Sequence, residues 1–295
     1  LNPCSSGGNR EAYVMAKKAI SRKTRAEIKA YLESFVEHVV SRYRERPVPS
    51  LDAPTAYLAK ASAKGQLKPF HAAIMPPELM RVSAFERGFS TALGTTFEEC
   101  ARLIARDYHA DAQRGYTLVE KVSLAALTEI ESQVAALDEA ATRGEPPPPL
   151  AQMVQRVLDA RRNDDLEQRR ARADLYVLAK DGTRLFFEMK SPQPNKGQCL
   201  EVTQRILRIH LLLGQQRPTA QAYYAMAYNP YGPTRAEYRW SFAHMYIPFA
   251  DAVLIGHEFW DVIGGPTAYA ELLGIYQEVG REKGKYMLDA LAFGF

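Results

Sequence analysis

Two short runs of apolar and aromatic residues, separated by turn-forming residues, give the clearest pattern in this chain. Residues 174–179 and 184–189 are rich in strand-forming side chains, and the Lys-Asp-Gly-Thr sequence between them is typical of a turn. This pattern predicts a β-hairpin. The first run opens at Asp174, and the second brings Glu188 and then Lys190 back to the same end. Three charged side chains therefore gather at one end of the hairpin.

The register of this hairpin follows from its turn. Successive side chains on a strand point to opposite faces, so Glu188 and Lys190 share a face. A three-residue loop over 180–182, with Gly182 in the left-handed bulge position, places Asp174 opposite Glu188. A two-residue turn would shift the register by one and send Asp174 to the opposite face. We therefore predict the three-residue loop.

Apolar residues recur at helical spacing in several other segments. A capping box at 24–27 is expected to open the first helix, and Thr95 or Thr96 is expected to cap the second. Because predicted strands alternate with predicted helices, we expect an α/β (α+β) fold with a mixed sheet flanked by helices. The apolar helical segments are 28–43, 97–108, 124–141, 150–158, 199–213 and 269–276, and further strands are predicted at 221–228 and 252–255.

The segment 259–266 combines aromatic residues with Gly264, Gly265 and a proline. We expect an aromatic turn here. Its two glycines could approach a ligand backbone, whereas the aromatic side chains are more simply explained by packing.

A charged run over 161–172 precedes the hairpin. Acidic residues are mixed with its arginines, as on a solvated helix face, and the run is a poor strand. We therefore find no clear first core strand before Asp174. Because Arg170 and Arg172 lie immediately before the charged end of the hairpin, they are also candidates for contacts with DNA phosphates.

Length and charge set broad limits on the protein. The 295 residues can form one large domain or two, and we expect a helical region at 1–84 packed on a core at 85–295. The net charge of +4 is mild, so a nucleic-acid partner would be held by local basic clusters. No stretch approaches the roughly 18 apolar residues that span a bilayer. We expect no membrane partner.

The number and spacing of the cysteines indicate the cellular compartment in which the protein acts. Cys4, Cys100 and Cys199 are an odd number and lack the paired spacing of zinc ligands. Reduced thiols in a cytoplasmic protein fit this pattern.

The charged end of the hairpin predicts metal-dependent chemistry. Two carboxylates that face each other need a cation or a shared proton, because burying them uncompensated is unfavourable. Asp174, Glu188 and the Met189 carbonyl offer the oxygen ligands that Mg²⁺ prefers. Lys190 on the same face would orient the attacking water and stabilise charge on the phosphate. The reaction implied is phosphodiester hydrolysis, although a Glu-x-Lys sequence by itself is common and can be a simple salt bridge.

A third acid is a candidate for the same site. On the helix predicted after Thr95, Glu98 lies at the edge of the apolar stripe and could reach inward. The alternative is that Glu98 or Glu99 completes a capping box at the start of that helix.

Four longer sequence strings resemble those of a particular nuclease family. They resemble the type II restriction endonucleases of the TdeIII family, within the PD-(D/E)XK nuclease superfamily, from about residue 21 to the C-terminus. The resemblance matches the superfamily's acidic residue to Asp174 and its Glu-x-Lys pair to Glu188 and Lys190, and it implies an αβββαβ core. Ala173 stands where a proline often precedes the acidic residue. The strings are Phe-Glu-Arg-Gly-Phe-Ser-Thr-Ala-Leu-Gly-Thr-Thr-Phe-Glu-Glu from 85, Phe-Glu-Met-Lys-Ser-Pro-Gln-Pro-Asn-Lys-Gly-Gln from 187, Ala-Tyr-Asn-Pro from 227 and Glu-Phe-Trp-Asp-Val-Ile-Gly-Gly from 258.

The resemblance implies a homodimer that cuts double-stranded DNA at a short palindrome of the type GGNCC and leaves 5′ overhangs. A two-fold protein matches a palindrome and places one metal site on each strand. A cognate DNA methyltransferase is expected in the same system, but not as a physical partner.

Several polar residues are candidates for DNA contacts. Arginine is the usual partner of guanine in the major groove, and amide and lysine side chains after the hairpin would lie nearer the scissile phosphate. The groove candidates are Arg205, Arg208, Arg235 and Arg239, and the phosphate candidates are Asn195, Lys196 and Gln198.

The sequence is also compatible with two other functions. One is a repair or junction nuclease of the same fold that reads DNA shape. The other is a non-catalytic DNA-binding protein, which the intact set of Asp174, Glu188 and Lys190 disfavours.

Overall fold

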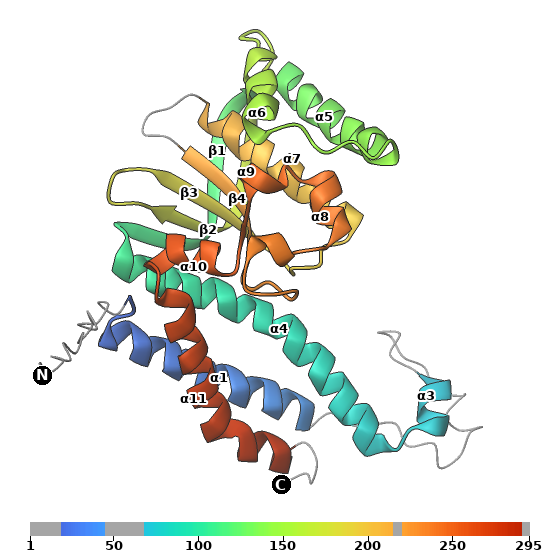
Figure 1. Ribbon diagram of the computed structural model, residues 1–295, viewed down its shortest axis with the longest axis vertical. Coiled ribbons are helices and arrows are strands. Elements are labelled where there is room, and N and C mark those ends of the chain that lie inside the picture. Colours follow the sequence, from blue (N-terminus) through green and yellow to red (C-terminus); the bar gives the residue numbers. More distant parts are fainter. Residues whose placement is uncertain (1–18, 45–67, 215–219, 291–295) are drawn as a thin grey trace, which may run out of the picture.

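A five-stranded sheet lies at the centre of the computed structural model, which describes residues 19–44, 68–214 and 220–290 (Figure 1). The first three strands pair antiparallel, and the last two continue the sheet in parallel. The expected mixed sheet is therefore confirmed. In spatial order the strands are β1 (Asp111–Ser123), β2 (Leu166–Leu178), β3 (Arg184–Met189), β4 (Ala220–Met226) and β5 (Val253–Ile255).

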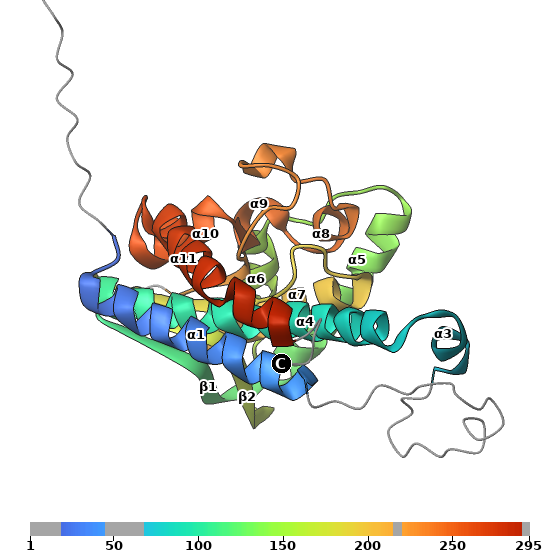
Figure 2. The same cartoon turned by 90° about the horizontal axis from the view of Figure 1, so that it is seen from below.

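Helices cover both faces of this sheet, as Figures 1 and 2 show from two directions. On one face lie α5 (Leu124–Thr142), α6 (Leu150–Asp159), α7 (Lys196–Leu213), α8 (Ser241–Tyr246) and α9 (Phe249–Ala252). On the other face lie α1 (Arg22–Arg44), α4 (Pro77–Tyr108), α10 (His257–Gly264) and α11 (Ala268–Leu288). The short α3 (Pro69–Ile74) lies at the end of α4 that projects away from the sheet (Figure 2).

The central strand β3 explains why two separate cores form. Phe186 packs with the cluster under α7, whereas Phe187 packs with the cluster under α4 and α10. Both rings are at most 1% exposed. Successive residues of one strand thus hold both helical layers on the sheet, and burial of each phenylalanine contributes roughly 1.5–3 kcal/mol. This double burial makes β3 a rigid support for the residues at its end.

The hairpin between β2 and β3 has the predicted three-residue loop. The Ala179 amide donates to the Thr183 carbonyl at 2.8 Å, and Gly182 has a φ of 87°. The paired residues run from Leu178 opposite Arg184 back toward the charged end. The predicted register is therefore confirmed, and its continuation sets Asp174 opposite Glu188.

Two predicted helix starts were wrong. The first helix, α1, begins at Arg22, and the Thr24 amide already donates to the Ser21 hydroxyl at 3.2 Å. Helix α4 is continuous from Pro77 to Tyr108, so neither Thr95 nor Thr96 caps a helix. Their hydroxyl groups instead donate to backbone carbonyls three residues earlier, which lets both residues sit inside a helix.

The first core strand, which the sequence did not reveal, is β1. The charged run before Asp174 was also wrongly interpreted as a solvated helix face, because the second half of this run forms the start of β2 and pairs along β1. Arg170 and Arg172 are exposed there, whereas Ala171 and Ala173, which alternate with them along the strand, are buried. Small alanines provide the buried face of this part of the strand, which is why it lacks the strong apolar alternation expected of a core strand.

The expected aromatic turn at 259–266 is also wrong, because this segment begins inside helix α10. Phe259 and Trp260 are buried, as the packing interpretation predicted. A Cβ atom on Gly264 would lie 2.3 Å from Cγ2 of Ile104. This glycine therefore lets α10 approach α4 and does not face a ligand.

The N-terminal expectations are only partly covered by the structure. The segment 1–18 with Cys4, and the chain from 45 to 67, lie outside the described residues. Helix α4 runs without a break through position 84, and the division into 1–84 and 85–295 stays a prediction. None of the described helices combines the length and the apolar character needed to cross a membrane.

Candidate active site

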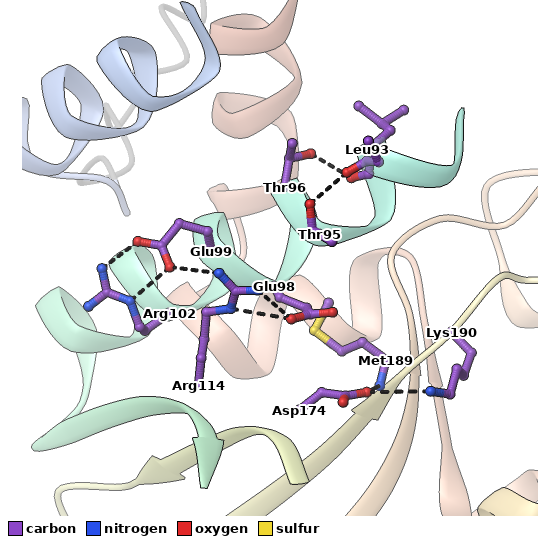
Figure 3. A network of polar contacts seen from close by, with 11 residues as sticks. Leu93, Thr95, Thr96, Glu98, Glu99, Arg102, Arg114, Asp174, Met189 and Lys190 are labelled. Atoms are coloured by element: carbon purple, nitrogen blue, oxygen red, sulfur yellow. Dashed lines mark hydrogen bonds and ion pairs between the residues drawn. The ribbon is translucent and has the colours of Figure 1, made fainter. Parts of the chain in front are cut away.

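Three charged side chains converge at the end of β3, as the hairpin register requires. The Lys190 ammonium lies 2.7 Å from Glu188 Oε1 and 3.9 Å from Asp174 Oδ2. The Met189 amide donates to Asp174 Oδ2 at 2.9 Å, so the backbone of β3 fixes the carboxylate of β2 (Figure 3). Glu188 is only 2% exposed. The cluster is thus a buried carboxylate, that of Glu188, beside a partly exposed carboxylate and a partly exposed ammonium group.

A fourth charged residue joins this cluster from α7. Arg205 Nη1 donates to Glu188 Oε1 at 2.7 Å, and Arg205 Nη2 reaches Glu201 Oε1 at 2.5 Å. The sequence placed Arg205 among the groove-reading arginines and did not predict this pairing. The available signal was weak, because Glu201 and Arg205 form an ordinary i,i+4 pair on a helix.

The charges shift the pKa values of the cluster. Burial raises the pKa of Glu188, and the negative charge of Asp174 raises it further, against the lowering effects of Lys190 and Arg205. For Lys190, burial alone would lower the pKa. The hydrogen bond to Glu188 and the charges of Glu188 and Asp174 outweigh that effect, so the pKa of Lys190 is raised. Lys190 is therefore an ammonium at neutral pH.

The donor set fits a hard divalent cation. Glu188 Oε2 is buried and has no hydrogen-bond partner among the described residues. Such an oxygen is unfavourable unless a cation or a donor meets it. No group of three or more His, Cys, Asp or Glu residues is placed to hold a metal within the part of the chain described. Mg²⁺ commonly takes one or two carboxylates and completes its shell with waters and substrate phosphate, so two acids and the Met189 carbonyl suffice.

A glycine on the edge strand lies beside the site. Register pairs on either side of it, Arg114 with Leu175 and Tyr116 with Ala173, place Gly115 opposite Asp174. Its φ is 62°, in the left-handed region that favours glycine. This relationship joins positions far apart in the sequence, and no local pattern predicted it.

An arginine-lined groove of about 590 Å³ adjoins the cluster. It lies between β2, with Thr117 of β1, and helix α7. Four arginines line it together with Thr117, Glu201 and Gln204, and they are Arg170, Arg172, Arg205 and Arg208. Arg205 belongs to both places, because the same guanidinium pairs with Glu188. The structure therefore brings four of the predicted DNA-contacting residues together.

A second pocket, of about 550 Å³, is lined by Lys190 and Met189 and includes Glu98. Glu98 Oε2 accepts from Arg114 Nη2 at 2.6 Å, and Figure 3 shows its carboxylate next to Met189 and above Asp174. Because α4 is continuous here, neither Glu98 nor Glu99 closes a capping box at a helix start. A catalytic role for Glu98 stays a prediction.

The three residues predicted to contact phosphates lie at the start of α7 and make contacts within the protein, and their DNA contacts stay a prediction. Asn195 and Gln198 form a reciprocal capping box, with both hydrogen bonds at 2.9 Å. Lys196 pairs with Asp138 at 2.5 Å, and its ammonium lies 5.6 Å from the centre of the Tyr246 ring. Gln198 also lines the Glu98 pocket, so it remains beside Lys190.

The remaining two arginines lie away from the groove. Arg235 donates to Glu258 Oε1 at 2.8 Å and to the Phe249 carbonyl at 2.9 Å, which ties the short 3₁₀ helix η1 (Arg235–Glu237) to the base of α10. Arg239 is exposed between η1 and α8. The structure thus engages Arg235 in internal contacts.

Comparison with known proteins covers most of the chain. The model of the family described as "Type II restriction endonuclease, HinfI" matches residues 20–280. The type II restriction enzyme HgiEI of Herpetosiphon aurantiacus is 47% identical over 265 residues, which make up 90% of this chain and 96% of that relative. The type II restriction enzymes HgiBI and HgiCII of the same organism are 45% and 44% identical over the same shares.

Proposed function

This chain belongs to the HinfI family of type II restriction endonucleases, and we propose that it hydrolyses double-stranded DNA with Mg²⁺ at the cluster of Asp174, Glu188 and Lys190. The resemblance to type II restriction endonucleases noted in the sequence is thereby confirmed. We also propose that the chain is a member of the PD-(D/E)XK superfamily and is similar to the TdeIII family. The proposed cleavage site is of the GGNCC type. The observation that carries the proposed hydrolysis is the Lys190 ammonium 2.7 Å from Glu188 and 3.9 Å from Asp174.

Asp174, Glu188 and the Met189 carbonyl are the groups that would hold the Mg²⁺ ion. The unpartnered Oε2 atom of buried Glu188 supports this assignment. When bound, Mg²⁺ supplies Lewis-acid polarisation of the scissile phosphate and lowers the pKa of the attacking water.

Lys190 acts as a fixed positive charge. Its raised pKa keeps it protonated, so it donates hydrogen bonds and does not accept a proton. Its ammonium would orient the attacking water and stabilise the negative charge that grows on the phosphate oxygens. Glu188 holds it in position at 2.7 Å, and Glu188 is itself fixed by its place on the buried strand β3.

The arginine groove is the proposed path of the DNA backbone. Arg170 and Arg172 of β2 and Arg208 of α7 line it, next to Arg205, which pairs with Glu188. Phosphate contacts of this kind fix the register of a protein on DNA without reading bases. Base reading would fall to other residues, and exposed Arg239 remains a candidate for it.

A two-fold dimer would explain how both strands are cut. Two copies related by a two-fold axis match a palindrome and bring one cluster to each strand. The GGNCC-type sequence and the 5′ overhangs come from the resemblance to the TdeIII family. The enzyme would act in the cytoplasm, where a cognate methyltransferase protects the host DNA.

Glu98 is proposed as an additional acid of the site. It lines the same pocket as Lys190 and Met189. From there its carboxylate would meet the substrate strand or a water molecule.

Incubation of the protein with plasmid DNA and Mg²⁺ tests the function. We expect discrete fragments, none in EDTA, and a loss of about 10²–10³-fold in rate for Lys190→Ala, the usual effect of removing one charge that stabilises a transition state. Lys180→Ala is the matched control, because Lys180 is an exposed turn residue over the Tyr108 ring. Smears, or nicks confined to branched DNA, would support a repair nuclease. Retention of DNA without cutting would overturn the enzyme assignment.

A further inference from the structure

Two cations share one oxygen of Glu188. The Lys190 ammonium and Arg205 Nη1 both lie 2.7 Å from Oε1. The other oxygen, Oε2, is buried and receives no donor from the described residues. Both cations therefore hold the carboxylate from one side.

Arg205 also extends toward the DNA groove. Its side chain is 28% exposed and its second terminal nitrogen pairs with the exposed acid Glu201 at 2.5 Å. The same guanidinium lines the groove with Arg172 and Arg208. It therefore lies where the site and the groove meet.

We infer that Arg205 is an internal counter-ion for Glu188, which gives up this ion pair when a divalent cation binds and then contacts a DNA phosphate in the arginine groove. The inference rests on the proposed function, since it assumes that Glu188 binds the metal. It adds a positioning residue that couples metal binding to DNA binding.

Charge balance supports this exchange. Asp174 and Glu188 carry two negative charges, and Lys190 and Arg205 carry two positive charges, so the four side chains are neutral together. A divalent cation at the same acids leaves an excess of two positive charges, and these repel one another strongly at short distance. Release of Arg205 to a phosphate relieves part of that repulsion. Lys190 stays, because it contacts both acids.

A purely structural role is the alternative explanation. Arg205 would then only tie α7 to the end of β3, and its loss would loosen the site and weaken metal binding. The counter-ion role predicts the opposite sign for metal affinity, since the competing charge is gone.

Mg²⁺ binding to the DNA-free protein separates the two explanations. We expect Arg205→Gln to bind Mg²⁺ about five- to tenfold more tightly than the wild type, the lower part of the usual range of coupling between linked sites. Calorimetry and the Mg²⁺-induced rise in melting temperature both report this affinity. The rise should be larger for Arg205→Gln than for the wild type, because its metal-free form has lost the counter-ion of a buried acid.

Two further variants serve as controls. Arg205→Lys keeps a positive charge near Glu188 and should keep an Mg²⁺ affinity close to that of the wild type. Arg208→Gln removes an arginine of the same groove that makes no ion pair with Glu188, so it should weaken DNA binding and leave the Mg²⁺ affinity unchanged.

The outcomes distinguish this inference from the function on which it rests. If plasmid is cleaved but Arg205→Gln binds Mg²⁺ as the wild type does or more weakly, Arg205 is a structural tie and the inference is overturned. An equal gain in affinity for Arg205→Lys would also overturn it, because charge would not be the cause. If the wild type neither binds Mg²⁺ nor cleaves DNA, the proposed function fails first.

Discussion

Gly115 on β1 lies opposite Asp174 on β2, with a left-handed backbone conformation at a φ of 62°. A Cβ atom at this position would lie 2.6 Å from Nη2 of Arg172. The glycine therefore does two things. It accepts a conformation that is strained for other residues, and it leaves room for an arginine of the proposed DNA groove.

Gly115→Ala should lower both stability and DNA affinity. The left-handed conformation costs an alanine about 1–2 kcal/mol, which urea unfolding would measure. The displaced Arg172 guanidinium should weaken DNA binding by about three- to tenfold, since one phosphate contact would be lost.

Gly274→Ala is the matched control for this change. Gly274 lies within α11, and an added Cβ would meet nothing within 4 Å. Because alanine favours a helix over glycine by about 1 kcal/mol, this variant should be as stable as the wild type or more so. An equal loss in both variants would show that Gly115 has no special role.

Glu98 and Glu99 offer a paired test of the proposed third acid. Both contact Arg114, at 2.6 Å and 3.3 Å, but only Glu98 lines the pocket that contains Lys190. Glu98→Gln should therefore slow cleavage by at least about tenfold, as expected for a group that acts on the reacting phosphate or water. Glu99→Gln should leave the rate nearly unchanged. Single-turnover cleavage measures both, and equal effects would assign Glu98 to holding Arg114.

The part of the site that the sequence predicted is the local part. Turn chemistry at 180–182 fixes the register of one hairpin, and that register alone sets Asp174 opposite Glu188 with Lys190 beside them. A prediction of this kind needs no knowledge of the rest of the chain.

The parts that were missed depend on distant contacts. Arg205 reaches Glu188 only because α7 packs back across the sheet, and Gly115 reaches Asp174 only because β1 pairs with β2. The arginines of β2 resembled a solvated helix face because exposed charge is compatible with either structure. Only buried Ala171 and Ala173 mark that segment as a strand, and alanine carries little strand signal.

The arginine groove predicts a change in the salt dependence of DNA binding. Arg170→Gln and Arg208→Gln each remove one proposed phosphate contact, so each should lower the slope of log Kd against log salt by about one. Fluorescence anisotropy with a short duplex in EDTA measures the slope without cleavage. Arg143→Gln is the control, because Arg143 is an exposed residue at the end of α5 that pairs with Glu145 at 2.9 Å. A uniform effect of all three would indicate only a general loss of positive charge.

His210 on α7 should make the protein less stable in mild acid. Its Nε2 atom is buried without a partner among the described residues, and burial lowers the pKa of His210 from the usual 6.5 to about 4. Between these two values the unfolded chain binds a proton that the folded protein does not. Stability is therefore unaffected above pH 6.5 and falls as the pH drops, by about 2 kcal/mol at pH 5.

Urea unfolding at pH 7 and pH 5 isolates this contribution. His210→Leu removes the titrating group and should lose less stability than the wild type between the two pH values. The exposed residue His38 on α1 provides the control variant His38→Gln, which should follow the wild type. Other groups also titrate in this range, so the difference between variants is the informative quantity. An identical pH dependence for His210→Leu and the wild type would mean that the folded protein already accommodates the charged imidazole, through water at Nε2 or a local opening of α7.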